Sequence, residues 1–124
     1  LRKHLKKLNK DFCHLCEYTP RKDVTRDRAD FFKKRAPIML YTERLHFYHR
    51  LKIDGVEHVY FYGLPMLPRF YLEIANFVPS KLRAKAKVTV LYTQYETLAL
   101  ERVVGTDSAV TMMSSNKTTH MFVV

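Results

Sequence analysis

The stretch APIMLYTERLHFYHRLKIDGVEHVYFYGLP, from Ala36 to Pro65, decides the fold of this chain. It contains two short apolar strands, Ile38–Thr42 and His58–Tyr62, separated by a charged segment with the character of a helix. Two strands joined by a helix form a crossover unit, and such units build parallel sheets. Because open parallel sheets bind ligands where their strands end, the landmarks for function are Thr42-Glu43-Arg44 and Gly63-Leu64-Pro65.

Strands and helices alternate along the rest of the chain. Apolar runs predict further strands over Phe12–Glu17, Val88–Thr93 and His120–Val124. Periodic apolar faces and end signals predict helices over Leu1–Asn9, from Asp23 or Thr25 to about Lys34, over Glu43–Leu51, Leu67–Phe77 and Gln94–Val104, and from Thr106 or Asp107 to about Ser115. This alternation predicts one α/β domain, a three-layer parallel sheet covered by crossover helices.

The composition favours a nucleic-acid partner. The 124 residues hold 22 Lys and Arg against 12 Asp and Glu, a net charge of +10, and such an excess attracts polyanions. No apolar run is long enough for a membrane span and no signal peptide is visible, so no membrane partner is expected. Because the chain opens without Met, we expect it to be a piece of a longer protein.

The residues give no sign of a metal, a cofactor or catalytic chemistry. Cys13 and Cys16 have the spacing of a metal-binding pair, but residues three apart on a strand point to opposite faces, and no second pair completes a zinc site. Buried, reduced thiols in a cytosolic or nuclear compartment are the expectation. The six histidines show no metal spacing, and none of the three glycines lies in a phosphate-cradling loop.

Several strings of this sequence resemble one family. The strings EYTPRKDVTRDRADFF, LYTERLHFYHRLKIDGVEHVYFYGLP, RFYLEIANF and VVGTDSAVTMM…HMFVV resemble the digestive-organ-expansion-factor family, also called the U3 small nucleolar RNA-associated protein 25 family. The resemblance covers nearly all 124 residues. It implies a nuclear, nucleolar protein of the small-subunit processome that acts in pre-18S ribosomal RNA processing. The partners it implies are pre-ribosomal RNA, the U3 small nucleolar ribonucleoprotein and other processome proteins, with no small-molecule substrate.

The family's fold is similar to that of DEAD-box RNA helicases, which have two RecA-like domains. On this resemblance, residues 1–124 form most of the second domain, whose first strand would precede Leu1. Thr42-Glu43 stands where active helicases have Thr-Asp, but the following Arg-Gly pair is absent. The helicase motif whose arginines stabilise charge on ATP corresponds to Pro68–Phe77, which keeps only Arg69 and adds Glu73.

The resemblance therefore implies a degenerate helicase core that binds without catalysing. One alternative is the C-terminal half of an active ATP-dependent RNA helicase. Another is a protein-interaction scaffold with little RNA contact. No ATP or other cofactor is expected in the favoured interpretation.

The candidate RNA contacts lie at strand ends, helix starts and one connector. In helicases the segment matching Thr42, Glu43 and Arg44 contacts the sugar-phosphate backbone, although Thr42 can equally cap the following helix. Arg26 and Arg28 near a helix start can meet phosphates, or form ion pairs with Asp23, Asp27 and Asp30 on a solvated face. Lys81 and Arg83, with Lys85 and Lys87, form a basic connector that either binds RNA or keeps the chain soluble.

The segment from His46 to Arg50 mixes aromatic and basic groups, a combination that can stack on unpaired bases. In the competing interpretation, Leu45, Tyr48 and Leu51 pack on the sheet as the apolar side of the helix. Phe47 is the better candidate for exposure, and Arg50 is included among the RNA contacts.

Overall fold

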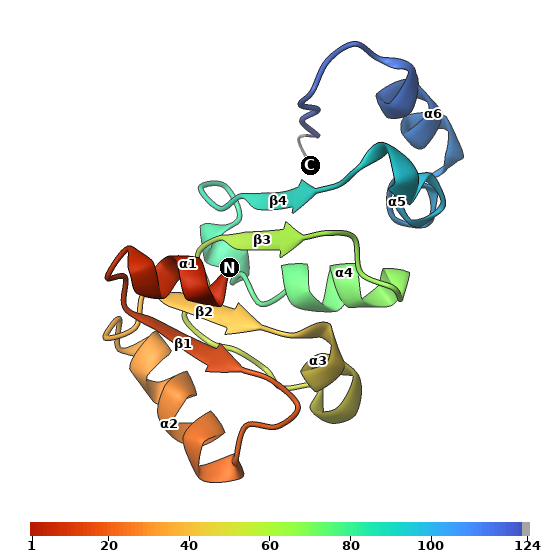
Figure 1. The fold of residues 1–124 in the computed structure, drawn as a ribbon. Coiled ribbons are helices and arrows are strands. Elements are labelled where there is room, and N and C mark those ends of the chain that lie inside the picture. The colour runs from red at the N-terminus through yellow and green to blue at the C-terminus, as the bar shows by residue number, and fades with distance from the viewer. Residues whose placement is uncertain (123–124) are drawn as a thin grey trace. The chain divides into compact units, whose positions relative to one another are not determined.

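The computed structural model describes residues 1–122 as a mixed α/β chain (Figure 1). Its strands are β1 (Phe12–Leu15), β2 (Ile38–Tyr41), β3 (Val59–Tyr62) and β4 (Val88–Leu91). Its α-helices are α1 (Arg2–Lys7), α2 (Arg21–Phe32), α3 (Glu43–His49), α4 (Pro68–Ala75), α5 (Thr97–Val104) and α6 (Thr106–Ser114), with 3-10 turns η1 (Ser80–Leu82) and η2 (Gln94–Glu96). None of the helices in the described part has the length and apolar character to cross a membrane. The predicted order of these elements is confirmed.

The chain divides into two compact units. Unit 1 comprises Leu1–His58 and Asn76–Lys87, and unit 2 comprises residues 59–75 and 88–122 of the described chain. Each unit contains one parallel pair of strands: β1 pairs with β2 in unit 1, and β3 pairs with β4 in unit 2. Parallel pairing is therefore confirmed, while a continuous RecA-like sheet stays a prediction.

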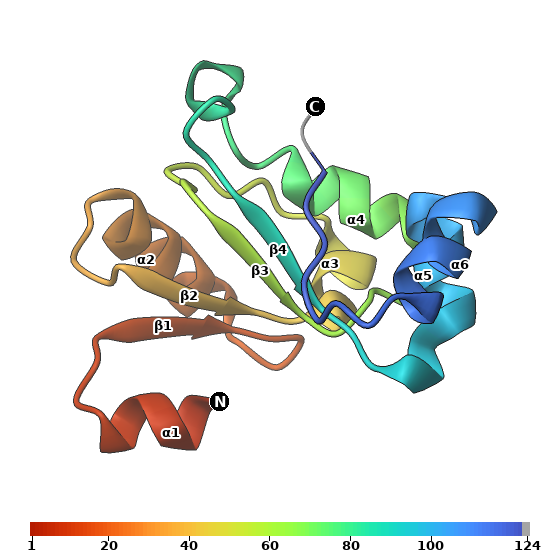
Figure 2. The ribbon, with the colours of Figure 1, turned by 90° about the horizontal axis from the view of Figure 1, so that it is seen from above.

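The core of unit 1 forms around β1. Burial alternates along this strand, as expected for a strand with unlike faces, and Cys13 and Leu15 are the buried positions. Helices α1 and α2 lie on opposite sides of the β1–β2 pair (Figures 1 and 2). Leu45 of α3 and Ile53 and Val56 of the following loop are also buried. Unit 1 thus has a small core beneath a strongly polar surface.

Gly55 makes the turn in that loop possible. Its φ is +83°, a region that side-chain-bearing residues avoid. A Cβ placed on Gly55 would lie 3.3 Å from the Cα of Phe32, at the end of α2. The turn predicted from Asp54-Gly55 therefore needs glycine both for its backbone angle and for its close approach to α2.

Unit 2 buries one face of its strand pair and the seam between its last two helices. Phe61 of β3 packs its ring 5.2 Å from that of Tyr71 of α4, between centroids. Leu100 of α5 and Ala109 and Met112 of α6 form a buried cluster. Gly105 separates these helices with φ +87°, so the predicted glycine end of α5 is confirmed.

One predicted helix start and one predicted strand are wrong. Helix α2 begins at Arg21, ahead of the predicted caps, because the carbonyl of Pro20 accepts hydrogen bonds from the N–H groups of Asp23 and Val24. Thr25 instead donates its hydroxyl to the Arg21 carbonyl. The predicted fifth strand is absent over residues 120–122, since an apolar run forms a strand only where it finds a pairing partner. Its last two residues, 123 and 124, lie outside the described residues.

Candidate nucleic-acid interface

The excess positive charge belongs almost entirely to unit 1. This unit holds 19 of the 22 Lys and Arg residues and 8 of the 12 Asp and Glu residues, a net charge of +11. Unit 2 holds the remaining 3 basic and 4 acidic residues, a net charge of −1. Any attraction for a polyanion therefore comes from unit 1.

Within unit 1, one carboxylate joins the carboxyl ends of β1 and β2. Glu17, just beyond β1, accepts a hydrogen bond from the Thr42 hydroxyl (3.4 Å, Oγ1 to Oε2) and lies 3.6 Å from Arg44 (Oε1 to Nε). The Glu17 side chain is 16% exposed, whereas that of Arg44 is 69% exposed. The outer part of the Arg44 guanidinium thus faces solvent from an anchored position.

Thr42 is fully occupied by structural contacts. Its Oγ1 accepts a hydrogen bond from the Leu45 N–H (3.3 Å), so the predicted cap of α3 is confirmed. Because the hydroxyl proton is donated to Glu17, Thr42 has no proton left to donate to a phosphate. Glu43 lies in the first turn of α3, where a carboxylate suits the helix dipole but repels phosphate. Of this landmark, Arg44 is the group suited to bind an anion.

Arg50 ends α3 in a left-handed conformation, with φ 42° and ψ 51°. Its N–H donates to the His46 carbonyl (2.9 Å) and terminates the helix. Arg50 and Arg44 therefore stand at the two ends of one short helix.

The two arginines of α2 contribute to internal contacts. Arg26 forms ion pairs with Asp23 and Asp27, both at 3.1 Å. The hydrogen bonds that Arg26 donates to Asp27, together with the negative charge of Asp23, raise the pKa of Arg26. Arg28 donates Nη2 to the Lys52 carbonyl and so ties α2 to the loop before β3. A phosphate reaching either arginine must compete with these partners.

The basic connector is folded in part. Residues Ser80–Leu82 form η1, and Arg83 donates Nη2 to Asn76 Oδ1 (3.1 Å). Lys81 and Arg83 are both exposed. The connector thus presents cations from a turn rather than from an extended chain.

The aromatic side chains of α3 are buried and exposed only in part as predicted. His46 is only 2% exposed, and its Nδ1 is 3.0 Å from the Tyr41 hydroxyl. The ring of Phe77 lies 6.0 Å from His46, so this histidine is enclosed by aromatic rings and is not available for base stacking. Tyr48 is 62% exposed, so the prediction that it packs on the sheet is wrong. The buried side of this short helix is formed by Leu45 and His46 instead. The predicted exposure of Phe47 is confirmed at 54%.

Both cysteines are free thiols, but the expectation that both are buried holds only for Cys13, because Cys16 is half-buried. Cys13 is buried on β1, and burial, with a smaller effect of Asp27, raises the pKa of its thiol to about 11. Cys16 lies past the strand with its Sγ 3.5 Å from the Thr19 hydroxyl. Over residues 1–122, no three His, Cys, Asp or Glu side chains are grouped so that they would hold a metal ion.

The second landmark, Gly63-Leu64-Pro65 in unit 2, faces a carboxylate. Glu96 accepts a hydrogen bond from the Leu64 N–H (3.3 Å) through Oε1 and from the Thr93 N–H (2.7 Å) through Oε2. These hydrogen bonds lower the pKa of Glu96 and so favour its ionised form, and the bond from the Thr93 N–H has the largest effect. Such a strand end is unfavourable for a phosphate.

Sequence reasoning missed Glu17 and Glu96. Glu96 was detectable, because Thr93 and Glu96 have the Thr-x-x-Glu spacing of a capping box, which the structure contains. Glu17 gave only a weak signal, as the acidic last residue of the strand predicted over Phe12–Glu17. Neither residue belongs to a pattern specific for nucleic-acid binding.

The chain matches the family described as "Utp25, C-terminal domain" over residues 1–122. It is 40% identical to the "U3 small nucleolar RNA-associated protein 25 homolog" of Homo sapiens over 126 aligned residues, which cover 99% of this chain and 17% of the human protein. It is 39% identical to "Protein NUCLEOLAR FACTOR 1" of Arabidopsis thaliana, covering 98% and 16% of the two chains. A Komagataella phaffii relative, "U3 small nucleolar RNA-associated protein 25", is 35% identical over 94% of this chain.

The chain spans less than one fifth of the length of these relatives, with 17%, 16% and 18% of each covered. No solved structure matches it.

Proposed function

Since this chain belongs to the family of the Utp25 C-terminal domain, we propose that it is the RNA-binding module of a small-subunit processome component. The relatives are named for association with the U3 small nucleolar RNA, and one is named a nucleolar factor. The module would act in the nucleolus during pre-18S ribosomal RNA processing, on pre-ribosomal RNA and the U3 ribonucleoprotein.

The separation of charge carries this proposal. A net charge of +11 on unit 1, against −1 on unit 2, is far more than solubility requires of a unit of this size. RNA backbone contacts come mainly from exposed Arg and Lys side chains. Arg44 is held by Glu17 at the carboxyl end of the β1–β2 pair with its outer nitrogens in solvent, and Arg50, Lys81 and Arg83 add further exposed cations.

We further propose a non-catalytic, RecA-like domain, related to helicases but without their ATPase. The observation that supports the loss of ATPase chemistry is Glu96, whose ionised carboxylate holds the strand end at Gly63-Leu64-Pro65. Arg69 is the only arginine of the neighbouring segment, and its guanidinium carbon lies 5.5 Å from the ring centre of Phe70, a cation–π contact on its own helix. An active helicase half remains the competing proposal, and RNA-stimulated ATP hydrolysis by the full-length protein that is lost in Arg69→Ala would favour it.

A second candidate function, docking of other processome proteins, is favoured by unit 2. This unit has a net charge of only −1. Its β3–β4 pair leaves large side chains exposed to solvent: Tyr60 is 72% exposed, Tyr62 80% and Leu91 55%. Such side chains are typical of protein interfaces. Both functions can belong to one protein, one in each unit.

RNA affinity as a function of salt tests the main proposal. In the full-length protein, Arg44→Gln should weaken binding to single-stranded RNA at every salt concentration and reduce the slope of log affinity against log salt by about one. Arg102→Gln is the matched control, because Arg102 is an exposed arginine of unit 2. Equal effects of the two substitutions would mean that unit 1 is not the RNA-binding half.

A further inference from the structure

β1 lies at an open edge of its strand pair. Within residues 1–122 it pairs only with β2. The Leu15 carbonyl accepts the Thr42 N–H (3.2 Å) on the β2 side, and backbone groups of successive residues point in opposite directions along a strand. The N–H and C=O groups of Phe12 and the N–H of His14 therefore face the open edge. The Thr19 hydroxyl lies 3.5 Å from the His14 carbonyl and covers the strand's end.

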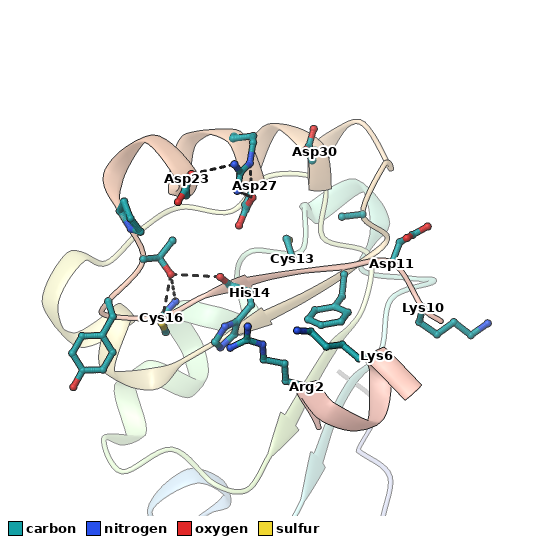
Figure 3. A pocket seen from close by; sticks show the side chains of 16 residues that line it. Arg2, Lys6, Lys10, Asp11, Cys13, His14, Cys16, Asp23, Asp27 and Asp30 are labelled. Atoms are coloured by element: carbon teal, nitrogen blue, oxygen red, sulfur yellow. Dashed lines mark hydrogen bonds and ion pairs between the residues drawn. The ribbon is translucent and has the colours of Figure 1, made fainter. Parts of the chain in front are cut away.

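An open groove of about 580 Å³ runs along this edge, and its two sides carry opposite charges (Figure 3). Asp23, Asp27 and Asp30 of α2 line one side, the side toward which Cys13 points. Arg2 and Lys6 of α1, with Lys10, line the other, the side on which His14 lies. The groove is thus acidic on one face of β1 and basic on the other.

The carboxylates keep the capacity to bind a further cation. Asp23 and Asp27 pair with Arg26, and Asp30 pairs with Arg35, and each of these ion pairs uses Oδ1. Oδ2 of each carboxylate is available to a second donor. Both arginines are more than 60% exposed, so these ion pairs are weak and a new partner can rearrange them.

We propose that the β1 edge is a docking site for an extended peptide of a partner protein, in which basic and acidic residues alternate. A peptide that adds to a strand edge forms backbone hydrogen bonds, and its side chains point alternately to the two faces. In this groove every second side chain would face the α2 carboxylates and the intervening ones would face the α1 cations. The groove therefore favours a partner whose charge changes sign at every residue. A polyanion such as RNA does not have this alternation.

Synthetic peptides test this on the intact protein. The probe is a capped hexapeptide in which Lys and Glu alternate, and its matched control has the same composition with the three Lys before the three Glu. We expect the alternating peptide to bind at least about tenfold more tightly, because only it places every charge on its complementary side. The backbone amide signals of Phe12 and His14 should shift in NMR spectra. Equal binding of the two peptides would overturn the proposal.

Backbone methylation separates strand addition from simple charge attraction. N-methylation of the alternating peptide at the residues whose N–H groups face β1 should cost about tenfold in affinity, and methylation at the other residues should cost little. Asp27→Asn should weaken binding about threefold, and Asp54→Asn, an exposed carboxylate outside the groove, should not. Insensitivity to the methylation pattern, or displacement of the peptide by single-stranded RNA, would contradict a peptide site.

Discussion

Glu17 Oε1 lies 3.6 Å from Arg44 Nε, and the same carboxylate accepts the hydroxyl of Thr42. The contact joins the loop after β1 to the start of α3, so the two strand ends of unit 1 are held together by side chains as well as by backbone. It also fixes the inner edge of the guanidinium. An arginine held in this way loses less side-chain entropy when its outer nitrogens bind an anion.

We predict that Glu17→Ala lowers the free energy of unfolding by about 1 kcal/mol, because it removes one long hydrogen bond and one partly exposed ion pair. Urea denaturation measures this change. Glu57→Ala is the matched control, since Glu57 forms an ion pair with Lys34 in which both side chains are more than half exposed, and its urea midpoint should barely move. Equal midpoints for the two variants would show that Glu17 does not join the strand ends.

Gly55 and Gly105 provide a test that separates backbone strain from crowding. Both have positive φ, but a Cβ on Gly55 would meet the Cα of Phe32 at 3.3 Å, and one on Gly105 would meet nothing within 4 Å. Both alanine variants should lose about 1–2 kcal/mol through strain. Gly55→Ala should lose more, because the end of α2 must also move. Thermal unfolding of both variants checks the order, and a larger loss for Gly105→Ala would contradict this account.

Much of the fold followed from local patterns. The crossover unit from Ala36 to Pro65 predicted two strands and a helix, and all three are present, each within about two residues of its expected bounds. Gly105 predicted the end of α5, and Thr42 the start of α3, because these signals act through neighbouring backbone atoms. The strand at the C-terminal end failed over residues 120–122, because strand formation depends on a partner that the local sequence does not specify.

The candidate site was less predictable, because it depends on contacts between residues distant in sequence. Glu17 and Thr42 are 25 positions apart, and nothing local indicated that their side chains meet. The same holds for Arg28, which the sequence offered as an RNA contact and which donates to the carbonyl of Lys52. For His46, composition suggested stacking on bases, whereas the fold encloses it between Tyr41 and Phe77.

We predict that His46 is a structural residue. His46→Ala should cost about 3 kcal/mol, because His46 is 2% exposed and its removal leaves a cavity beside Tyr41 and Phe77. His46→Phe should cost only about 1 kcal/mol, since it keeps the ring and loses the hydrogen bond with Tyr41. His49→Ala, an exposed position on the same helix, is the control and should be near neutral. If His46→Ala instead impaired RNA binding at unchanged stability, His46 would be a contact residue after all.

The raised pKa of the buried Cys13 thiol predicts that the protein loses stability at alkaline pH. Its thiol loses a proton near pH 9.0 in the unfolded chain but only near pH 11 in the native structure, because burial disfavours the thiolate. Between these values the native state binds more protons than the unfolded state, so the free energy of unfolding falls as the pH rises from about 9 to 11. Below pH 9 the thiol makes no pH-dependent contribution. The free energy of unfolding, measured by denaturation at several pH values, should therefore fall more steeply between pH 9 and 11 for the natural sequence than for Cys13→Ala.

Alkylation reports the same property through the reactive species itself. Because the thiolate is the nucleophile, iodoacetamide should modify Cys13 slowly at pH 8 in the folded protein and quickly after denaturation. A Cys16→Ser background leaves Cys13 as the only thiol in residues 1–122, so the rate can be assigned to it. The rate in the folded protein should continue to rise with pH up to about 11. A rate that levels off below pH 9 would show that the Cys13 thiol is not shielded by the α2 side of β1.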